Sequence, residues 1–251
     1  MARMQMNHPR PVALVTGAAR RVGAVIALRL HAAGYDIALH HRASAAEAAA
    51  LAARMQAERP DSVLLLQGEL ADDAVPARLV ADCLARFGRL DALVNNASAF
   101  YPTPVGEATP AQFDELFAAN ARAPFFLAQA AAPALRAAGG AIVNLADIYG
   151  ERPLPAHTLY CMAKAALLML TRSLARELGP EVRVNAVAPG AVLWPDGGKA
   201  EKEKAAMLAA TALGRAGDPA DVAEAVRWLL QDARYTTGDV IRVDGGRSLS
   251  L

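Results

Sequence analysis

A tyrosine and a lysine four residues apart form the first pair in this sequence that is suited to proton transfer. Tyr160 and Lys164 fall in a segment, Thr158–Leu178, that is predicted to be a helix ending before Gly179 and Pro180. On a helix they lie one turn apart on the same face. A neighbouring ammonium lowers the pKa of a phenol, so Tyr160 is predicted to exchange a proton near neutral pH. A single tyrosine and lysine pair of this kind is more often an ordinary part of a helix surface. Other motifs are therefore needed to decide whether Tyr160 and Lys164 are catalytic.

The turn after the first predicted strand has features of a dinucleotide-binding loop. It runs from Thr16 to Gly23, between a buried strand, Val12–Thr16, and a helix, Arg20–Ala33. Gly17 allows a tight turn, Gly23 allows close helix packing, and the amino end of the helix favours a pyrophosphate. Taken alone, a loop with so few glycines is equally consistent with an ordinary strand-to-helix turn. Its position after the first strand and the later motifs favour a cofactor-binding loop. The predicted cofactor contacts in this loop are Gly17, Arg20, Arg21, Val22 and Gly23.

The end of the second predicted strand, Asp36–His40, indicates which cofactor is bound. An enzyme that uses NAD usually ends this strand with an acidic residue that binds the ribose 2′-hydroxyl. Here the strand runs into a turn without an acid, in which Arg42 and Ser44 are predicted to bind a 2′-phosphate. Arg20 or Arg21 is expected beside them. NADPH is therefore the predicted cofactor, and a solvated basic turn is the alternative.

Two adjacent histidines, His40 and His41, lie at the end of the same strand. Adjacent strand residues point to opposite faces of a sheet, so the two cannot form one metal site, and no metal is predicted. His40 is the one expected to line the adenosine pocket.

Short apolar runs alternate with longer helical runs along the whole chain. Strands that are apolar throughout are typical of a sheet covered on both faces, and strands alternating with helices predict a parallel sheet. The predicted fold is α/β, a Rossmann-type doubly wound parallel sheet with helices on both faces, in a single domain. The predicted strands are Val12–Thr16, Asp36–His40, Ser62–Leu66, Asp91–Val94, Ala141–Leu145, Val182–Val187 and Val240–Val243. The predicted helices are Arg20–Ala33, Ser44–Glu58, Asp72–Phe87, Thr109–Ala138, Thr158–Leu178 and Asp218–Leu230. Ser44 is predicted to cap the second of these helices, and Asp72 or Asp73 the third.

Length and composition narrow the function classes further. The chain has 251 residues, 54% of them apolar, which suits one domain with a sizeable core. A net charge of +1 without a basic stripe argues against a nucleic-acid partner, and no uncharged run reaches the length of a membrane span. Two distant cysteines form no disulfide framework, so a cytoplasmic location is expected. We expect a flexible N-terminus over residues 1–10 and a single NADP-binding domain over residues 11–251.

Five motifs occur in the order and spacing of one large enzyme family. They are the turn Thr16–Gly23, Asn95-Asn96-Ala97 after the fourth strand, Asn120, the pair Tyr160 and Lys164, and Pro189-Gly190. In combination these motifs are highly specific. Over nearly the whole chain the sequence resembles the short-chain dehydrogenase/reductase family.

That resemblance implies roles for individual residues. Tyr160 is implied to be the acid, and Lys164 to anchor the nicotinamide ribose and to hold a proton-relay water together with Asn120. A homotetramer is also implied, built in part on the helices that start near Ala111 and Thr158. The other implied cofactor contacts are Glu69, Leu70, Asn96, Ala97, Ser98, Pro189 and Gly190, with Glu69 standing where the family more often has an aspartate.

One departure from the family pattern is informative. The family usually has a serine, which polarises a carbonyl, at the position of Asp147. A carboxylate repels a developing oxyanion, so carbonyl reduction fits poorly. In pterin reduction the hydride goes to a ring carbon of a C=N unit and the nitrogen needs a proton, which a carboxyl group hydrogen-bonded to Tyr160 can help deliver. The alternative is that Asp147 is a divergent serine in a weak or inactive enzyme.

Aspartate at this position resembles the pteridine reductases, and so do Arg21 in the phosphate loop, residues 95–104 and the tail 243–249. By this resemblance Phe100 stacks on the pterin, although a plain apolar wall is the alternative. Ser98 is implied to bind the pterin edge or the cofactor, and Arg21 to reach both phosphate and substrate. Trp194, in the irregular segment Pro189–Lys204, is expected either to close over the pterin or to pack within a substrate lid.

The predicted activity is hydride transfer from NADPH to a dihydropteridine, with dihydrobiopterin, dihydromonapterin and dihydrofolate as candidates. The predicted catalytic residues are Asp147, Tyr160, Lys164 and Asn120. The predicted substrate contacts are Arg21, Ser98, Phe100, Asp147, Tyr160 and Trp194. A reductase of another carbonyl or imine substrate is the nearest alternative. A non-catalytic NADPH-binding sensor is a more distant one, because a pure binder has no need of Tyr160, Lys164 and Asn120 together.

Overall fold

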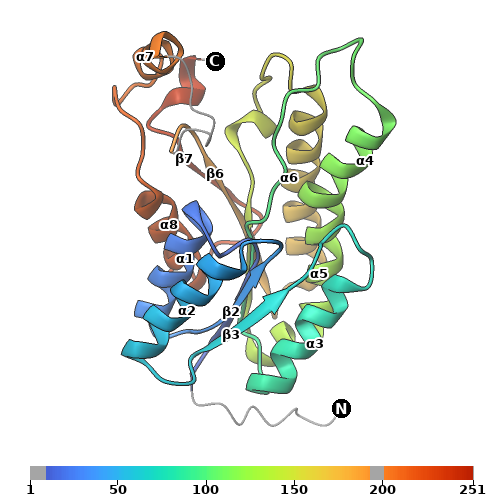
Figure 1. Ribbon diagram of the computed structural model, residues 1–251, viewed down its shortest axis with the longest axis vertical. Coiled ribbons are helices and arrows are strands. Elements are labelled where there is room, and N and C mark those ends of the chain that lie inside the picture. Colours follow the sequence, from blue (N-terminus) through green and yellow to red (C-terminus); the bar gives the residue numbers. More distant parts are fainter. Residues whose placement is uncertain (1–9, 193–200, 251) are drawn as a thin grey trace.

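Seven parallel strands form one sheet in the computed structural model, which describes residues 10–192 and 201–250 (Figure 1). Their order is β3-β2-β1-β4-β5-β6-β7, so the direction of winding reverses between β1 and β4. In such a sheet ligands bind at the carboxyl ends of the strands beside this reversal. The strands are β1 Val12–Val15, β2 Asp36–His41, β3 Val63–Gln67, β4 Ala92–Asn95, β5 Ala141–Leu145, β6 Arg183–Pro189 and β7 Val240–Val243.

Helices cover both faces of this sheet (Figure 1). One face is covered by α1 Arg21–Ala32, α2 Ala45–Glu58 and α8 Pro219–Gln231, and the other by α3 Val75–Phe87, α5 Ala123–Ala138 and α6 Thr158–Leu178. Alternate residues of β1 point to opposite faces of the sheet. Val15 packs in the apolar core beneath α1, α2 and α8, and Leu14 packs in the core beneath α3, α5 and α6. Every β1 residue is fully buried, which explains its unbroken apolar run. The predicted doubly wound fold is confirmed. Among the described residues no helix is long and apolar enough to cross a membrane.

The expected continuous helix Thr109–Ala138 is interrupted. It consists of α4 Pro110–Phe117, a π-helical turn Ala118–Arg122, and α5. Thr109 caps α4 in a capping box with Gln112. Because Pro124 has no N–H, the carbonyl of Asn120 lacks the donor that a regular α-helix supplies four residues on. The prediction of one unbroken helix was therefore wrong at Asn120.

The region expected to be an irregular lid contains a helix, α7 Glu201–Ala209. The expectation that the loop Pro189–Lys204 has no regular structure is wrong from Glu201 onward. Residues 193–200, including Trp194, lie outside the described residues. Helix α7 stands beside the C-terminus at the top of the view (Figure 1), where Arg247 donates to the carbonyl oxygen of Met207 at 2.9 Å.

Two helix starts also differ from the predictions. Ser44 precedes α2 but makes no capping hydrogen bond with its side chain. Helix α3 begins at Val75 rather than at Asp72, whose carboxylate instead accepts the N–H of Ala74 at 3.0 Å. Aspartate competes for backbone N–H groups in turns as well as at helix caps, so sequence alone does not fix which it serves.

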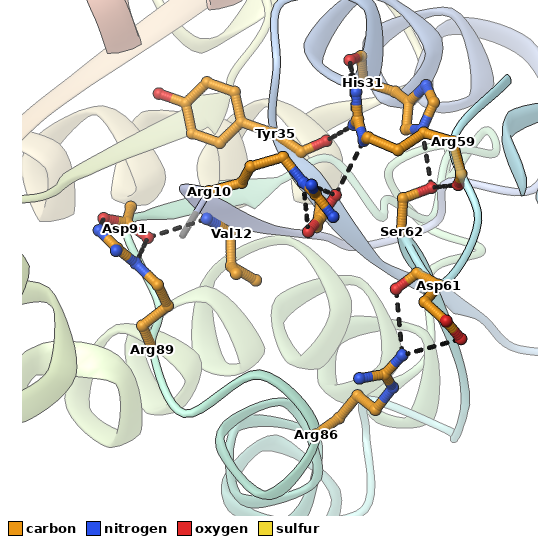
Figure 2. A network of polar contacts seen from close by, with 11 residues as sticks. Arg10, Val12, His31, Tyr35, Arg59, Asp61, Ser62, Arg86, Arg89 and Asp91 are labelled. Carbon is orange, nitrogen blue, oxygen red and sulfur yellow. Dashed lines mark hydrogen bonds and ion pairs between the residues drawn. The ribbon is translucent and has the colours of Figure 1, made fainter. Parts of the chain in front are cut away.

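A polar network ties the elements together at the amino ends of the strands (Figure 2). The fully buried carboxylate of Asp36 accepts from Arg10 Nε at 3.1 Å and from Arg59 Nε at 3.0 Å. Arg59 also donates to the carbonyl oxygen of His31, whose ring Nε2 lies 2.9 Å from Ser62 Oγ. This network joins α1, β2 and the approach to β3. Arg10, which was assigned to the flexible N-terminus, is held at this edge.

Candidate active site

Tyr160 and Lys164 lie one turn apart near the start of α6, and both side chains are buried. Lys164 Nζ donates to the carbonyl oxygen of Leu145 at 2.8 Å, at the end of β5, and lies 5.7 Å from the centre of the Tyr160 ring. The lysine therefore joins the carboxyl end of the sheet to the helix that carries the tyrosine.

Asp147 follows β5 and faces Tyr160. The Tyr160 hydroxyl donates to Asp147 Oδ2 at 2.7 Å, and the N–H of Tyr149 donates to Asp147 Oδ1 at 2.9 Å. The second bond caps a short 3-10 helix, Ile148–Gly150. Both carboxyl oxygens are thus engaged, which fixes the carboxyl group against the phenol.

Burial dominates the electrostatics of these three groups. Burial, and next the charge of Asp147, raise the pKa of Tyr160 well above its usual value. Burial also raises the pKa of Asp147, against the opposing bonds from Tyr149 and Tyr160. Burial lowers the pKa of Lys164 to about 8. The expectation that Lys164 lowers the pKa of Tyr160 was wrong for this site, because desolvation and the adjacent carboxyl outweigh the ammonium.

Asn120 sits in the π-helical turn and is buried. Its Nδ2 donates to the carbonyl oxygens of Leu116 and Ala99, each at 2.9 Å, and its Oδ1 accepts from Ser98 Oγ at 2.6 Å. Single π turns are frequent at functional sites because they redirect one residue of a helix. Here the turn joins Asn120 to the segment that follows β4.

Phe100 lies in that same segment and contacts two rings. It stands edge-on to Tyr160, with ring centroids 4.8 Å apart at 80°, and stacks on His157, with centroids 4.7 Å apart at 16°. About half of its surface is exposed, at 48%. The ring therefore combines a fixed position beside Tyr160 with surface available to a ligand.

The loop between β1 and α1 is built around two glycines. Gly17 has a left-handed φ of 60°, and a Cβ at Gly23 would lie 2.3 Å from the carbonyl oxygen of Gly17. Asn96 Nδ2 holds the loop by donating to the carbonyl oxygens of Thr16 and Gly17. Arg21 has a φ of 55°, in the left-handed region that favours glycine.

His40 supports this loop with both ring nitrogens. Its Nδ1 accepts from the N–H of Gly17 at 3.2 Å, which leaves Nε2 to donate to the carbonyl oxygen of Gly68 at 3.1 Å. Burial lowers the pKa of His40 to about 4, so the ring is neutral. His40 lines the cleft, but its polar atoms bind backbone groups, and its role is to brace the cleft walls.

Arg42, which follows β2, and Glu69, which follows β3, form an ion pair, with Arg42 Nη1 3.3 Å from Glu69 Oε2. Glu69 Oε1 also accepts from the N–H of Ala71 at 3.2 Å. The exposed Arg20 lies 3.9 Å from Glu47. A carboxylate therefore stands beside the arginine expected to bind the 2′-phosphate, a relationship the sequence did not indicate.

These groups surround one cleft of about 790 Å³ at the carboxyl ends of β1, β2 and β4. Most of the residues expected to bind cofactor or substrate line it: Gly17, Arg20, Arg21, Val22, Gly23, His40, Arg42, Ser44, Glu69, Leu70, Asn96, Ala97, Ser98 and Phe100. Lining residues that were not predicted include His41, Ala71, Tyr101 and Glu115. The buried Nδ1 of His41 makes no hydrogen bond within the described residues.

Asp147, Tyr160, Lys164 and Asn120 do not line the cleft itself. Asn120 contacts Ser98 and Tyr160 contacts Phe100, both of which line it. Pro189 and Gly190 lie at the end of β6, where a Cβ on Gly190 would meet Asp244 at 2.8 Å. This close approach packs the β6 end against the C-terminal segment. His157 was missed altogether, because it precedes the first residue of α6 and its contact with Phe100 is a tertiary one that the sequence does not show.

The residues present fit a nicotinamide dinucleotide. The Gly17 and Gly23 backbone allows close approach, the amino end of α1 favours phosphate, and the cleft continues to Phe100, whose ring contacts the Tyr160 ring. An orphaned buried nitrogen on His41 offers one further polar contact along the wall.

In the comparison with known proteins, residues 17–248 match the family model described as enoyl-(acyl carrier protein) reductase. The chain belongs to the short-chain dehydrogenase/reductase family. It is therefore an oxidoreductase of this family, whose members use a nicotinamide dinucleotide.

Individual relatives in this short-chain reductase family carry different names. "Pteridine reductase 1" of Leishmania tarentolae is 39% identical, covering 98% of this chain and 99% of the relative. A "granaticin polyketide synthase putative ketoacyl reductase 2" of Streptomyces violaceoruber is 38% identical over 95% and 96%. A "3-oxoacyl-[acyl-carrier-protein] reductase FabG" of Staphylococcus aureus is 35% identical over 93% and 96%. Overall identity therefore separates pteridine from ketoacyl reductases weakly, and the site residues must carry the distinction.

Proposed function

We propose that this short-chain reductase reduces a dihydropteridine to its tetrahydro form with NADPH. The observation that carries the proposal is the 2.7 Å hydrogen bond from Tyr160 to Asp147. A serine hydroxyl in this position donates to a developing oxyanion, whereas a carboxylate repels one. Dihydrobiopterin, dihydromonapterin and dihydrofolate are the candidate substrates.

The reaction needs one hydride and one proton at a C=N unit. NADPH, when bound, supplies the hydride to the ring carbon. The nitrogen takes the proton from Tyr160, and Asp147, with its raised pKa, returns a proton to the phenolate oxygen. Lys164, held by the Leu145 carbonyl, supplies a positive charge beside the tyrosine as this proton leaves. The C=N bond becomes CH–NH. One proton from solvent then returns Asp147 to its protonated form, so that Tyr160 and Asp147 are ready for the next turnover.

Phe100 is proposed to be the platform for the pterin ring. Its half-exposed ring lies 4.8 Å from the Tyr160 ring, so a flat heterocycle stacked on it lies within reach of the hydroxyl. Ser98, bonded to Asn120, and Arg21 at the cleft rim are proposed to bind the polar edge of that heterocycle and the phosphates.

NADPH is proposed over NADH because no acid ends β2. Arg42 and Ser44 line the cleft in the turn after this strand, where an arginine and a hydroxyl can bind a 2′-phosphate. Glu69 pairs with Arg42 and offsets part of this positive charge.

A homotetramer is proposed on the outer face of α4, α5 and α6. Large apolar side chains on these helices are exposed: Phe113, Phe125, Phe126, Met162 and Met169. Exposed apolar groups of this size commonly mark a protein interface. A mass in solution of about four times 26.3 kDa by light scattering is expected.

Reduction of a ketone or acyl thioester is the second candidate, favoured by the 38% and 35% identity to ketoacyl reductases. NADPH oxidation by the purified protein, at about pH 5 to 7, separates the two. Dihydrobiopterin, dihydrofolate, simple ketones and acyl thioesters are offered in parallel, each with NADPH and with NADH. Turnover of the pteridines alone, with NADPH preferred, is expected. Turnover of ketones or acyl thioesters alone would support the second candidate function. Tight NADPH binding without turnover would indicate a sensor.

A further inference from the structure

The ring of His157 covers one side of Phe100. The two rings are nearly parallel, at 16°, with centroids 4.7 Å apart, while Tyr160 meets Phe100 edge-on. His157 directly precedes α6, and Phe100 lies in the segment that follows β4. The stack is therefore a tertiary contact that joins the cleft wall to the start of the catalytic helix.

Three features hold the imidazole in this position. His157 Nδ1 donates to the carbonyl oxygen of Pro155 at 2.8 Å, which limits rotation of the ring. Ala156 has a φ of 60°, a left-handed conformation that is unfavourable for a residue with a side chain. The carbonyl of Ala156 accepts from the N–H of the buried Thr103 at 2.6 Å, which fastens this segment to the one that carries Phe100. Backbone strain of this kind persists where the surroundings enforce it.

We propose that His157 is a specificity-determining residue that fixes the plane of Phe100 for flat, aromatic substrates. A half-exposed phenylalanine with no neighbour turns freely about its side-chain bonds, and a ligand that stacks on it must first stop this motion. With one face of Phe100 covered by His157 and its edge set by Tyr160, the ring is oriented before the ligand arrives. The inference rests on the proposed function, because it assumes that a flat heterocycle stacks on Phe100.

This arrangement predicts discrimination between substrate shapes. A pterin gains from an oriented aromatic surface, whereas a flexible acyl chain has no plane to match. His157 therefore favours planar heterocycles over open-chain ketones at the same site. It is a positioning residue, since its contact is with Phe100 and not with the reacting atoms.

The test is a double-mutant cycle of His157→Ala and Phe100→Leu, with His157→Phe as the conservative variant and the exposed Thr158→Ala as the control. For His157→Ala the KM for dihydrobiopterin is expected to rise roughly threefold to tenfold, the contribution of one aromatic pair. Its kcat and its KM for NADPH are expected to stay within about twofold of the wild type. His157→Phe should keep the wild-type KM. In the Phe100→Leu background the loss of His157 should add nothing further.

Several outcomes would overturn the inference. One is an unchanged KM in His157→Ala; another is an equal penalty with and without Phe100, which would mean that His157 acts alone. Loss of NADPH affinity in His157→Ala but not in His157→Phe would mark a folding defect at the start of α6 and would also reject the substrate-specific role. Wild-type protein that neither binds nor turns over pteridines would overturn the proposed function as well. Failure of the proposed function is thus seen in the wild type, and failure of this inference only in the variants.

Discussion

The Tyr160 hydroxyl donates a hydrogen bond of 2.7 Å to Asp147, and the backbone N–H of Tyr149 holds the other carboxyl oxygen. The pKa of each group is raised, the tyrosine by burial and by Asp147, and the aspartate by burial. A phenol that keeps its proton thus stands beside a carboxyl group that takes one up more readily than usual. This pairing suits delivery of a proton to a weakly basic ring nitrogen.

Replacing Asp147 by serine tests that role. Serine can still accept from Tyr149 and meet Tyr160, so the substitution removes chiefly the carboxyl proton. We expect kcat/KM for the pteridine to fall by about 100-fold or more, the usual contribution of a positioned acid. NADPH affinity, measured by fluorescence titration, should change by less than about threefold because the carboxyl does not line the cleft.

The control for this substitution is Asp72→Ser. Asp72 also binds a backbone N–H through its carboxylate, that of Ala74, but it lies outside the cleft. Its replacement should leave both constants unchanged. Full pteridine activity in Asp147→Ser would remove Asp147 from the mechanism.

The pKa shifts predict a pH profile with two limbs. Burial raises the pKa of Asp147, so its protonated form persists to higher pH than in an ordinary carboxylic acid, and pteridine kcat/KM should fall as pH rises through that pKa. Burial lowers the pKa of Lys164 to about 8, so the ammonium is lost above that pH and a second fall is expected there. Measured from about pH 5 to pH 9, Asp147→Ser should lose the first limb and keep the second. Identical profiles for the two proteins would contradict this assignment.

The pair Arg42 and Glu69 predicts opposite changes in cofactor preference. For Arg42→Ala, kcat/KM with NADPH should fall roughly 10- to 100-fold, the worth of a charge-assisted phosphate contact, while NADH is used as before. For Glu69→Gln, the arginine loses its competing carboxylate, and the ratio of NADPH to NADH should rise about twofold to fivefold, as befits an exposed ion pair.

Steady-state kinetics with both cofactors measure these ratios directly. Arg20→Ala serves as a comparison, since Arg20 also lines the cleft but pairs with Glu47 instead. A fall in the ratio for Glu69→Gln would show that Glu69 supports the phosphate site and does not compete with it.

The sheet and the cofactor loop were predictable because their signals are local. Buried parallel strands such as β1 are apolar at every position, and Gly17 and Gly23 stand where a turn and a tight packing contact need them. The Tyr160 and Lys164 pair follows from helical spacing alone. Asp147 was found as a departure from a known pattern, and its bond to Tyr160 then follows from the fold.

The features that escaped prediction depend on tertiary contacts or on desolvation. The stack of Phe100 on His157 joins segments far apart in the chain, and the Arg42 and Glu69 pair joins the ends of two strands. The pKa of Tyr160 moves in the direction opposite to the one that Lys164 alone would give, because the sequence shows neighbours but not burial. The π turn at Asn120 arises from a proline four residues on, in a stretch whose apolar spacing otherwise predicts an unbroken helix.

The network around Asp36 carries a prediction about stability that is separate from catalysis (Figure 2). Arg59 binds the fully buried Asp36 carboxylate and the carbonyl oxygen of His31, at the edge of the sheet opposite the cleft. Arg59→Met leaves a buried carboxylate with less compensation, so unfolding free energy should fall by about 3 kcal/mol. For a domain of this size that corresponds to a drop in Tm of roughly 6 to 12 °C.

The matched control is Arg86→Met, because Arg86 binds the exposed Asp61 and lies over the Phe87 ring but compensates no buried carboxylate. Its loss should cost less than about 1 kcal/mol. Calorimetry and urea unfolding measure both variants, and the KM for NADPH should be unchanged in each, since neither arginine lines the cleft. Equal stability of Arg59→Met and Arg86→Met would mean that Asp36 is compensated without Arg59. A raised KM for NADPH in Arg59→Met would instead show that this edge of the sheet is coupled to the cleft through β2.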